Sequence, residues 1–158
     1  METSYDILIG LASISGIFIG FTALITASDD NKHSFLLKGV INIGMLCLVA
    51  SLFPILLGKF NINKDLIWRL SGILFFIIIW FSLLHSTTRR FLIKQFKIDL
   101  KAALFFWVVI ETPIQLPLIF CVLNIYPEYH EAFLIVSIVL NIIQAGYLLV
   151  QFVHAPKQ

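Results

Sequence analysis

The sequence is short of charged residues, and this shortage excludes several classes of protein. Only 13% of its 158 residues are charged, against about 25% in a typical soluble domain. Hydrophobic residues make up 59% of the chain, and the mean hydropathy is +0.97. This composition indicates an integral membrane protein. The net charge of +2 is too small to indicate a nucleic-acid partner.

Cysteine is scarce as well. Cys47 and Cys121 both lie in apolar runs without a CxxC spacing, so we expect neither a disulfide framework nor a metal site. A secretory signal begins with a basic region, whereas this chain has Glu2 and Asp6 there, so we expect no cleavable signal peptide. The loops are too short to hold a separate catalytic domain. These features argue against an enzyme and against a bound cofactor.

Five apolar runs are long enough to cross a bilayer as helices, which takes about 20 residues each. The runs are residues 7–27, 36–57, 66–85, 102–123 and 132–153. They predict an all-α integral membrane protein, a bundle of five transmembrane helices that forms a single domain over residues 1–158. The fourth run contains two prolines and two polar side chains, so a re-entrant fourth segment and four spans are the alternative.

Basic residues fall mainly on one side of this predicted bundle. If the N-terminus is outside, eight of the eleven lysines and arginines are cytoplasmic, and five of these lie in the loop 86–101. Cytoplasmic loops carry the excess of basic residues, so we expect the N-terminus outside and the C-terminus inside. At the outer end of the third run, Trp68 and Arg69 are expected to form an interfacial anchor, with the ring among the lipid headgroups.

The loop 86–101 also has a helical pattern. Read as a helix, it places four basic residues on one face and apolar residues on another. Such a basic amphipathic segment is suited to the anionic headgroups of the cytoplasmic leaflet. A plain topology signal explains the same charges, and the two interpretations are compatible. The predicted headgroup-binding residues are Arg90, Lys94, Lys97 and Lys101.

The polar centre of the fourth run is residues 111–117, ETPIQLP. An ionised carboxylate at mid-membrane is unfavourable by roughly 2.5 kcal/mol or more, so Glu111 should face protein or water. Pro113 and Pro117 each remove a backbone N–H and crowd the carbonyl one turn back, which predicts a kinked helix. Backbone groups released in this way need partners other than lipid.

A second polar pattern lies along one face of the last apolar run, residues 132–153. Ser137, Asn141, Gln144 and Gln151 lie within about 80° of one another around a helix, and we expect this stripe to face Glu111 or a partner subunit. The predicted polar intramembrane site consists of Glu111, Gln115, Asn42, Asn141 and Gln144. Either it is a hydrated site for an ion or proton, or Glu111 is a protonated acid whose hydrogen bonds hold the bundle together.

Small residues form a ridge on the first run. Gly16 and Gly20 make a GxxxG motif, and such ridges let helix backbones approach closely in lipid. The ridge predicts a contact either with a neighbouring helix of the same chain or with a second copy. Its predicted helix-packing residues are Ala12, Gly16, Gly20 and Ala23.

Three stretches carry a resemblance to known proteins. They are residues 14–21 (ISGIFIGF), 51–57 (SLFPILL) and 68–72 (WRLSG). In this order they resemble a group of small, uncharacterised bacterial multi-pass membrane proteins, over residues 7–90. The resemblance implies a location in the bacterial inner (cytoplasmic) membrane and implies no activity.

The patterns together predict a small membrane module that assembles as a homo-oligomer. It would provide a pathway for an ion, a proton or a small solute, or sense the state of the membrane. One alternative is a membrane-embedded lipid-binding protein or enzyme with its pocket at the kinked helix. Another is an accessory subunit whose partner, a membrane or cytosolic protein, supplies the activity. Membrane lipids are expected partners in each case.

Overall fold

The computed structural model describes residues 2–28, 34–60, 62–84 and 106–154. Four long helices lie in these ranges: α1 (Glu2–Ser28), α2 (Ser34–Gly58), α3 (Lys64–Leu84) and α7 (His130–His154). A shorter helix, α6 (Thr112–Leu123), continues from a π-helical turn, η1 (Phe106–Glu111). A 3-10 turn, η2 (Pro127–Tyr129), leads into α7. The predicted all-α class is therefore confirmed.

The helices are apolar over long stretches. Four are long and apolar enough to cross a membrane, over Thr3–Ala27, Leu37–Gly58, Lys64–Leu83 and Pro127–Val150. Val108–Leu123 is a shorter apolar helix. These helices correspond to the five apolar runs of the sequence. Pro113 stands in the first turn of α6 and Pro117 inside it, and the kink at these prolines stays a prediction.

Turn-forming residues mark the start of α3 and the end of α6. Before α3, the Asn63 side-chain oxygen accepts a hydrogen bond of 3.1 Å from the Asp65 N–H, which satisfies a free donor of the first turn. After α6, Asn124 adopts a left-handed conformation with φ 57°, and its N–H donates to the Cys121 carbonyl at 3.3 Å. Both are ordinary helix caps. Tyr126 also has a positive φ, of 52°, in the turn that leads to η2.

Contacts group the chain into two compact units. Unit 1 comprises Met1–Phe60 with Ile138–Gln158, and unit 2 comprises Asn61–Ser137. The boundary between them falls within α7, so this helix contributes its first turns to unit 2 and its remainder to unit 1. The prediction of a single domain is not tested by this grouping and stays a prediction.

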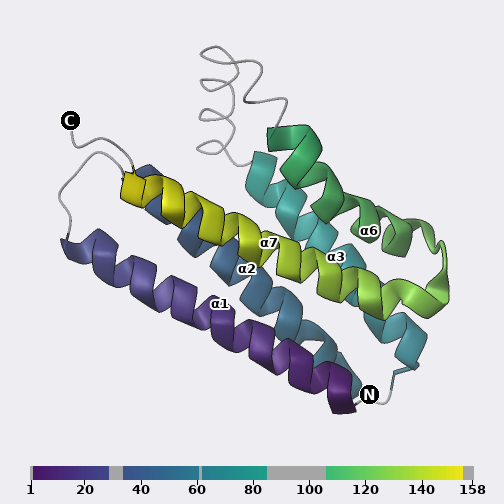
Figure 1. Ribbon diagram of the computed structural model, residues 1–158. Coiled ribbons are helices and arrows are strands. Elements are labelled where there is room, and N and C mark those ends of the chain that lie inside the picture. The colour runs from purple at the N-terminus through teal and green to yellow at the C-terminus, as the bar shows by residue number, and fades with distance from the viewer. Residues whose placement is uncertain (1, 29–33, 61, 85–105, 155–158) are drawn as a thin grey trace. The chain divides into compact units, whose positions relative to one another are not determined.

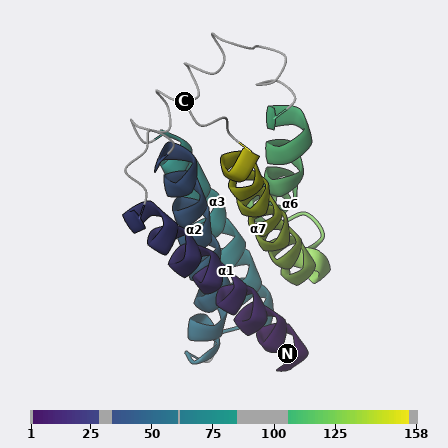
Figure 2. The ribbon, with the colours of Figure 1, turned by 60° about the vertical axis from the view of Figure 1, so that its left-hand side comes forward.

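In unit 1, α1 and α2 form an antiparallel pair, and Figures 1 and 2 both show them side by side. The two helices pack closely at Gly44. A Cβ atom on Gly44 would lie 2.8 Å from Ile19 Cγ1 and 3.4 Å from the Ser15 carbonyl oxygen. Because a real Cβ does not come so close to its neighbours, glycine permits this contact between the two helices.

The remainder of α7 packs against α2 in the opposite direction. The Cys47 thiol points at the Ile138 carbonyl, with 3.9 Å between sulfur and oxygen. Ten residues further along α7, Leu148 lies 3.4 Å from the position that a Cβ on Gly39 would take. Since the α2 numbers fall while the α7 numbers rise, the two helices are antiparallel.

In unit 2, α3 packs against α6. A Cβ on Gly72 would lie 2.7 Å from Cys121 Cβ and 3.0 Å from its sulfur. Trp68, one turn earlier on α3, is only 2% exposed. The expectation that its ring lies among lipid headgroups is therefore wrong: the indole is packed inside the protein.

Candidate functional site

Glu111 stands where the π-helical turn η1 passes into α6, and it is 5% exposed. Its backbone is helical, with φ −73° and ψ −42°. A π-helical turn holds one more residue per turn than an α-helical one needs, and such turns recur at functional sites. Pro113 follows two residues later, where its missing N–H belongs to the first turn of α6 and is least disruptive. Helix geometry thus places the carboxyl group at a change of helix type.

Gln115, one turn further on, is the hydrogen-bond partner of Glu111. Its side-chain nitrogen Nε2 donates to Glu111 Oε2 at 3.3 Å, and Gln115 is 8% exposed. Residues four apart share a helix face, so the two side chains lie on the same face of the helix. A buried carboxyl group with a carboxamide donor can act as an acid, a base or a hydrogen-bond acceptor.

A pocket of about 140 Å³ lies beside this pair. Its lining residues are Glu111, Thr112, Gln115, Leu116 and Ile119. They occupy one face of the helix, and Thr112 and Leu116 are exposed at its edge. Drug-sized ligands occupy pockets of about 300–1,000 Å³, whereas one water takes about 30 Å³ of liquid volume. The pocket therefore suits a few waters or a small solute.

A side chain of α7 supports the backbone of α6 next to this pair. Ser137 is fully buried, and its Oγ donates a hydrogen bond of 2.9 Å to the Ile114 carbonyl. Pro117 cannot donate a bond to the preceding turn and crowds the carbonyls there. Ser137 thus supplies a donor from another helix beside the proline. The expected stripe residue therefore contacts the backbone of α6 one residue from Gln115.

The other predicted site residues belong to unit 1. Asn141 and Gln144 are buried on α7, 4% and 6% exposed, whereas Asn42 is exposed on α2. The antiparallel contacts between α2 and α7 place Asn42 at the level of Gln144 along the two helices. Their predicted role beside Glu111 is not tested by these positions. The side chain of Gln151 lies outside the described residues.

The small-residue ridge of α1 is largely open. Ala12 is buried, but a Cβ on Gly16 or Gly20 would meet no atom within 4 Å, and Ala23 is exposed. In the part of the chain that the structure describes, the two glycines therefore make no close helix contact. A close contact between α1 and α2 occurs at Gly44 instead. Packing of the ridge against a second copy stays a prediction.

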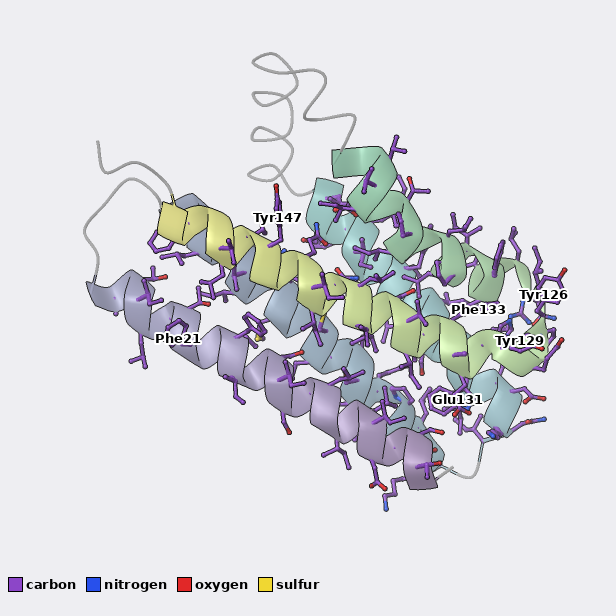
Figure 3. All side chains as sticks on the ribbon, in the orientation of Figure 1. Phe21, Tyr126, Tyr129, Glu131, Phe133 and Tyr147 are labelled. Atoms are coloured by element: carbon purple, nitrogen blue, oxygen red, sulfur yellow. The ribbon has the colours of Figure 1, made fainter. Side chains whose placement is uncertain are left out.

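Aromatic residues gather at the turn between α6 and α7 in unit 2. Figure 3 shows Tyr126 and Tyr129 in this turn and Phe133 one turn along α7. The Tyr126 and Tyr129 rings lie 6.5 Å apart, and those of Tyr129 and Phe133 lie 6.2 Å apart. Both tyrosines are more than half exposed. Exposed tyrosines at the end of an apolar helix are typical of a membrane–water interface.

The predicted headgroup-binding residues Arg90, Lys94, Lys97 and Lys101 lie outside the described residues. Within the described ranges, no three histidine, cysteine, aspartate or glutamate residues gather in a way that could hold a metal ion. No family model, curated protein or solved structure matches the chain. The site therefore has to be interpreted from its own geometry.

The sequence did not single out three of the residues that line the pocket. Thr112, Leu116 and Ile119 stand one, five and eight residues after Glu111. This spacing marks the face next to the glutamate, so the helical pattern could have found them. The π-helical turn has no comparable signal, because its residues are as apolar as those of an ordinary helix.

Proposed function

We propose that this protein is a polytopic membrane protein with a pathway for an ion or small polar solute at Glu111. The observation that carries the proposal is the buried Glu111–Gln115 pair on the wall of a pocket with room for a few waters. Carboxyl groups inside membranes are unfavourable, and they recur along ion and substrate pathways. Interrupted helices recur at such sites because they free polar backbone groups.

Exposed apolar side chains support the membrane location. Ile17, Leu24 and Phe81 are exposed by 70%, 73% and 73%. Apolar residues dominate long stretches of each helix, and soluble monomers rarely expose such large contiguous surfaces. Contact with lipid tails would remove these apolar surfaces from water.

Two independent contacts support five crossings rather than four. In unit 1, α2 and α7 are antiparallel, so α7 begins on the side of the membrane where α2 ends. The intervening chain must then cross an even number of times. One crossing is α3, so the segment that contains α6 supplies the other. A re-entrant segment would make α7 start on the opposite side of the membrane from the end of α2, which contradicts the antiparallel contacts.

The second contact lies in unit 2. Lys64 at the start of α3 and Glu131 at the start of α7 form an ion pair, with 3.5 Å between Nζ and Oε2. The two helices therefore begin on the same side. Together with the excess of basic residues in loops on the other side, this supports an outer N-terminus and a cytoplasmic C-terminus.

Cysteine labelling tests this orientation. A membrane-impermeant maleimide added to intact cells should label Asn61→Cys and Tyr126→Cys and leave Thr88→Cys unlabelled. The two native cysteines are buried and can be replaced beforehand. Labelling of Thr88→Cys from outside would reverse the orientation, and loss of labelling at Tyr126→Cys alone would leave four spans.

The small pocket argues against the lipid-binding alternative, because a lipid or sterol needs a larger volume. A purely structural role for Glu111 is the second candidate, and the Gln115 hydrogen bond favours it. That role predicts a normal Glu111→Gln variant, since an amide keeps the shape and can accept the bond. It also predicts that Glu111→Leu is unstable, because it leaves Gln115 without this acceptor.

Flux measurements separate the two candidates. Wild type, Glu111→Gln and Glu128→Gln are reconstituted in liposomes, and ion or proton flux is followed across pH. Glu128 is exposed and outside the pocket, so its variant is the matched control. We expect Glu111→Gln to fold but to lose the flux or its pH dependence, since an amide cannot ionise. Equal curves for the three proteins would favour the structural role.

The open ridge with Gly16 and Gly20 supports assembly with a second copy, and two-fold symmetry is the commonest closed arrangement. The resemblance over residues 7–90 supports a bacterial inner-membrane location. The basic loop 86–101 supports contact with anionic headgroups through the four residues Arg90, Lys94, Lys97 and Lys101. An accessory role beside a partner protein remains the alternative if purified wild type carries no flux.

A further inference from the structure

The exposed tyrosine pair at the turn between α6 and α7, Tyr126 and Tyr129, has a geometry that fits one kind of lipid headgroup. We infer that this pair binds the alkylammonium group of a zwitterionic phospholipid, with the acyl chains of the lipid against the end of α6. The inference rests on the membrane location proposed above. It is independent of any flux through the pocket at Glu111.

The first observation is the backbone of Tyr126, which is left-handed with φ 52° and ψ 65°. Asn124, two residues earlier, also has a left-handed backbone, but asparagine adopts this conformation far more readily than a bulky side chain does. Glycine would form the turn without strain, so the turn itself does not require a tyrosine. A strained residue of this kind motivates a search for a binding role.

The second observation is the arrangement of the two rings (Figure 3). Their centroids lie 6.5 Å apart and their planes meet at 73°. The face of an aromatic ring is negative and attracts a cation that lies within about 6 Å of the centroid. Because the centroid separation is well below twice that reach, one ammonium group can contact both rings at once. Tyr129 in turn packs against the Phe133 ring, 6.2 Å away, which holds this side of the pair in place.

The charges at this end of unit 2 favour a cation over an anion. The sequence has no lysine or arginine over residues 102–156, which include α6, the turn and α7. Lys64 at the start of α3 is paired with Glu131 at 3.5 Å. An anionic headgroup would therefore find no basic side chain on the turn itself. The charged groups of α3, the turn and the start of α7 are Lys64, Asp65, Arg69, Glu128 and Glu131, so carboxylates outnumber basic groups.

Exposed apolar side chains lead up to the pair and point to a lipid as the source of the ammonium group. Leu123 at the end of α6 and Ile125 in the turn are exposed by 62% and 36%. Acyl chains would cover these side chains, and the headgroup would then lie over the tyrosines, where the apolar helices end. A small soluble ammonium compound would leave the apolar surface uncovered.

Native mass spectrometry tests the headgroup preference. The protein in mild detergent receives equal amounts of phosphatidylcholine and phosphatidylglycerol with the same acyl chains, and the ratio of the two bound lipids is measured. Tyr126→Gly removes one ring and relieves the backbone, whereas Tyr126→Phe keeps the ring. Phe81→Leu removes a 73% exposed ring from α3 and is the control. Because the loop 86–101 is proposed to hold anionic lipid, the ratio is compared between variants.

We expect Tyr126→Gly to lower the ratio of bound phosphatidylcholine to phosphatidylglycerol about 2–5-fold, the effect of one cation–π contact at an exposed site. Tyr129→Leu should lower it by a similar factor, while Tyr126→Phe and Phe81→Leu should keep the wild-type ratio. An unchanged ratio in Tyr126→Gly and Tyr129→Leu would overturn the inference. Equal loss of both lipids would overturn it too, because a general aromatic belt predicts that result.

A competition experiment distinguishes a lipid from a soluble ligand. Glycerophosphocholine carries the same headgroup without acyl chains, and at a concentration equal to that of phosphatidylcholine it should not displace the lipid from wild type. Displacement at equal concentration would identify a soluble ammonium compound as the ligand and overturn the assignment to a lipid.

Discussion

The contact between Gly72 of α3 and Cys121 of α6 makes the packing of unit 2 directly testable. A Cβ on Gly72 would lie 2.7 Å from the Cys121 Cβ, whereas carbon atoms in contact prefer about 3.5–4.0 Å. Gly72→Ala must therefore move the two helices apart by about 1 Å at this point. Overpacking of this kind is unfavourable by about 1–3 kcal/mol.

Alanine also favours a helix over glycine by up to about 1 kcal/mol, which offsets part of this penalty. Gly10→Ala on α1 provides the matched control, because a Cβ there meets no atom within 4 Å. The difference between the two variants isolates the clash. For a chain of this size it corresponds to a melting temperature about 2–12 °C lower for Gly72→Ala than for Gly10→Ala.

Thermal unfolding in mild detergent, followed by circular dichroism, measures this difference. Adding Cys121→Gly to Gly72→Ala removes the opposing Cβ and should restore part of the loss, so the two substitutions should not be additive. The reasoning is refuted if Gly72→Ala and Gly10→Ala have the same melting temperature. It is also refuted if the change in melting temperature of the double variant equals the sum of the changes in the two single variants.

Three further predictions follow from the contacts within each unit. Gly44→Leu should lower the free energy of unfolding by about 1–3 kcal/mol or more, while Gly16→Leu should leave the melting temperature unchanged. Light scattering of Gly16→Leu then shows whether the substitution alters the oligomer. Ser137→Ala should lower stability by about 0.5–1.5 kcal/mol through its lost hydrogen bond, and Ser137→Thr, which keeps the hydroxyl, should recover most of it in the same assay. Lys64→Cys with Glu131→Cys, in a chain without native cysteines, should be joined by a bis-maleimide whose spacer replaces the reach of the Lys64 and Glu131 side chains, and absence of the cross-link on gels would remove one support for five spans.

The helices were the most predictable part of this protein. Long apolar runs fix their number and approximate position, because a helix satisfies its own backbone groups wherever the side chains are apolar. The pair of Glu111 and Gln115 was predictable too, since four residues bring two side chains to one helix face. Exact contacts between helices were harder to predict. Gly16 and Gly20 form the more obvious motif, yet the close contacts occur at Gly44 and Gly72.

The reason is that a glycine reveals where a backbone can approach another, and not which neighbour is present. The same limit applies to Trp68, whose position beside Arg69 suggested an interfacial ring. Burial of the indole depends on the helices packed around it, and the residues next to Trp68 in the sequence do not predict which helices these are. Ser137 was predicted as part of a polar stripe on α7, but its acceptor is a backbone carbonyl, that of Ile114. Side-chain stripes alone do not identify backbone acceptors.

The hydrogen bond from Ser137 to the Ile114 carbonyl also bears on biosynthesis. Its two residues are 23 positions apart, and the chain leaves the ribosome N-terminal end first. On the proposed topology, α6 reaches the translocon before its partner from α7 has been made. Its proline-freed carbonyls and Glu111 are unfavourable in lipid during that interval. We therefore expect α6 to be held by the translocon until α7 emerges, so that the two helices enter the bilayer as a pair.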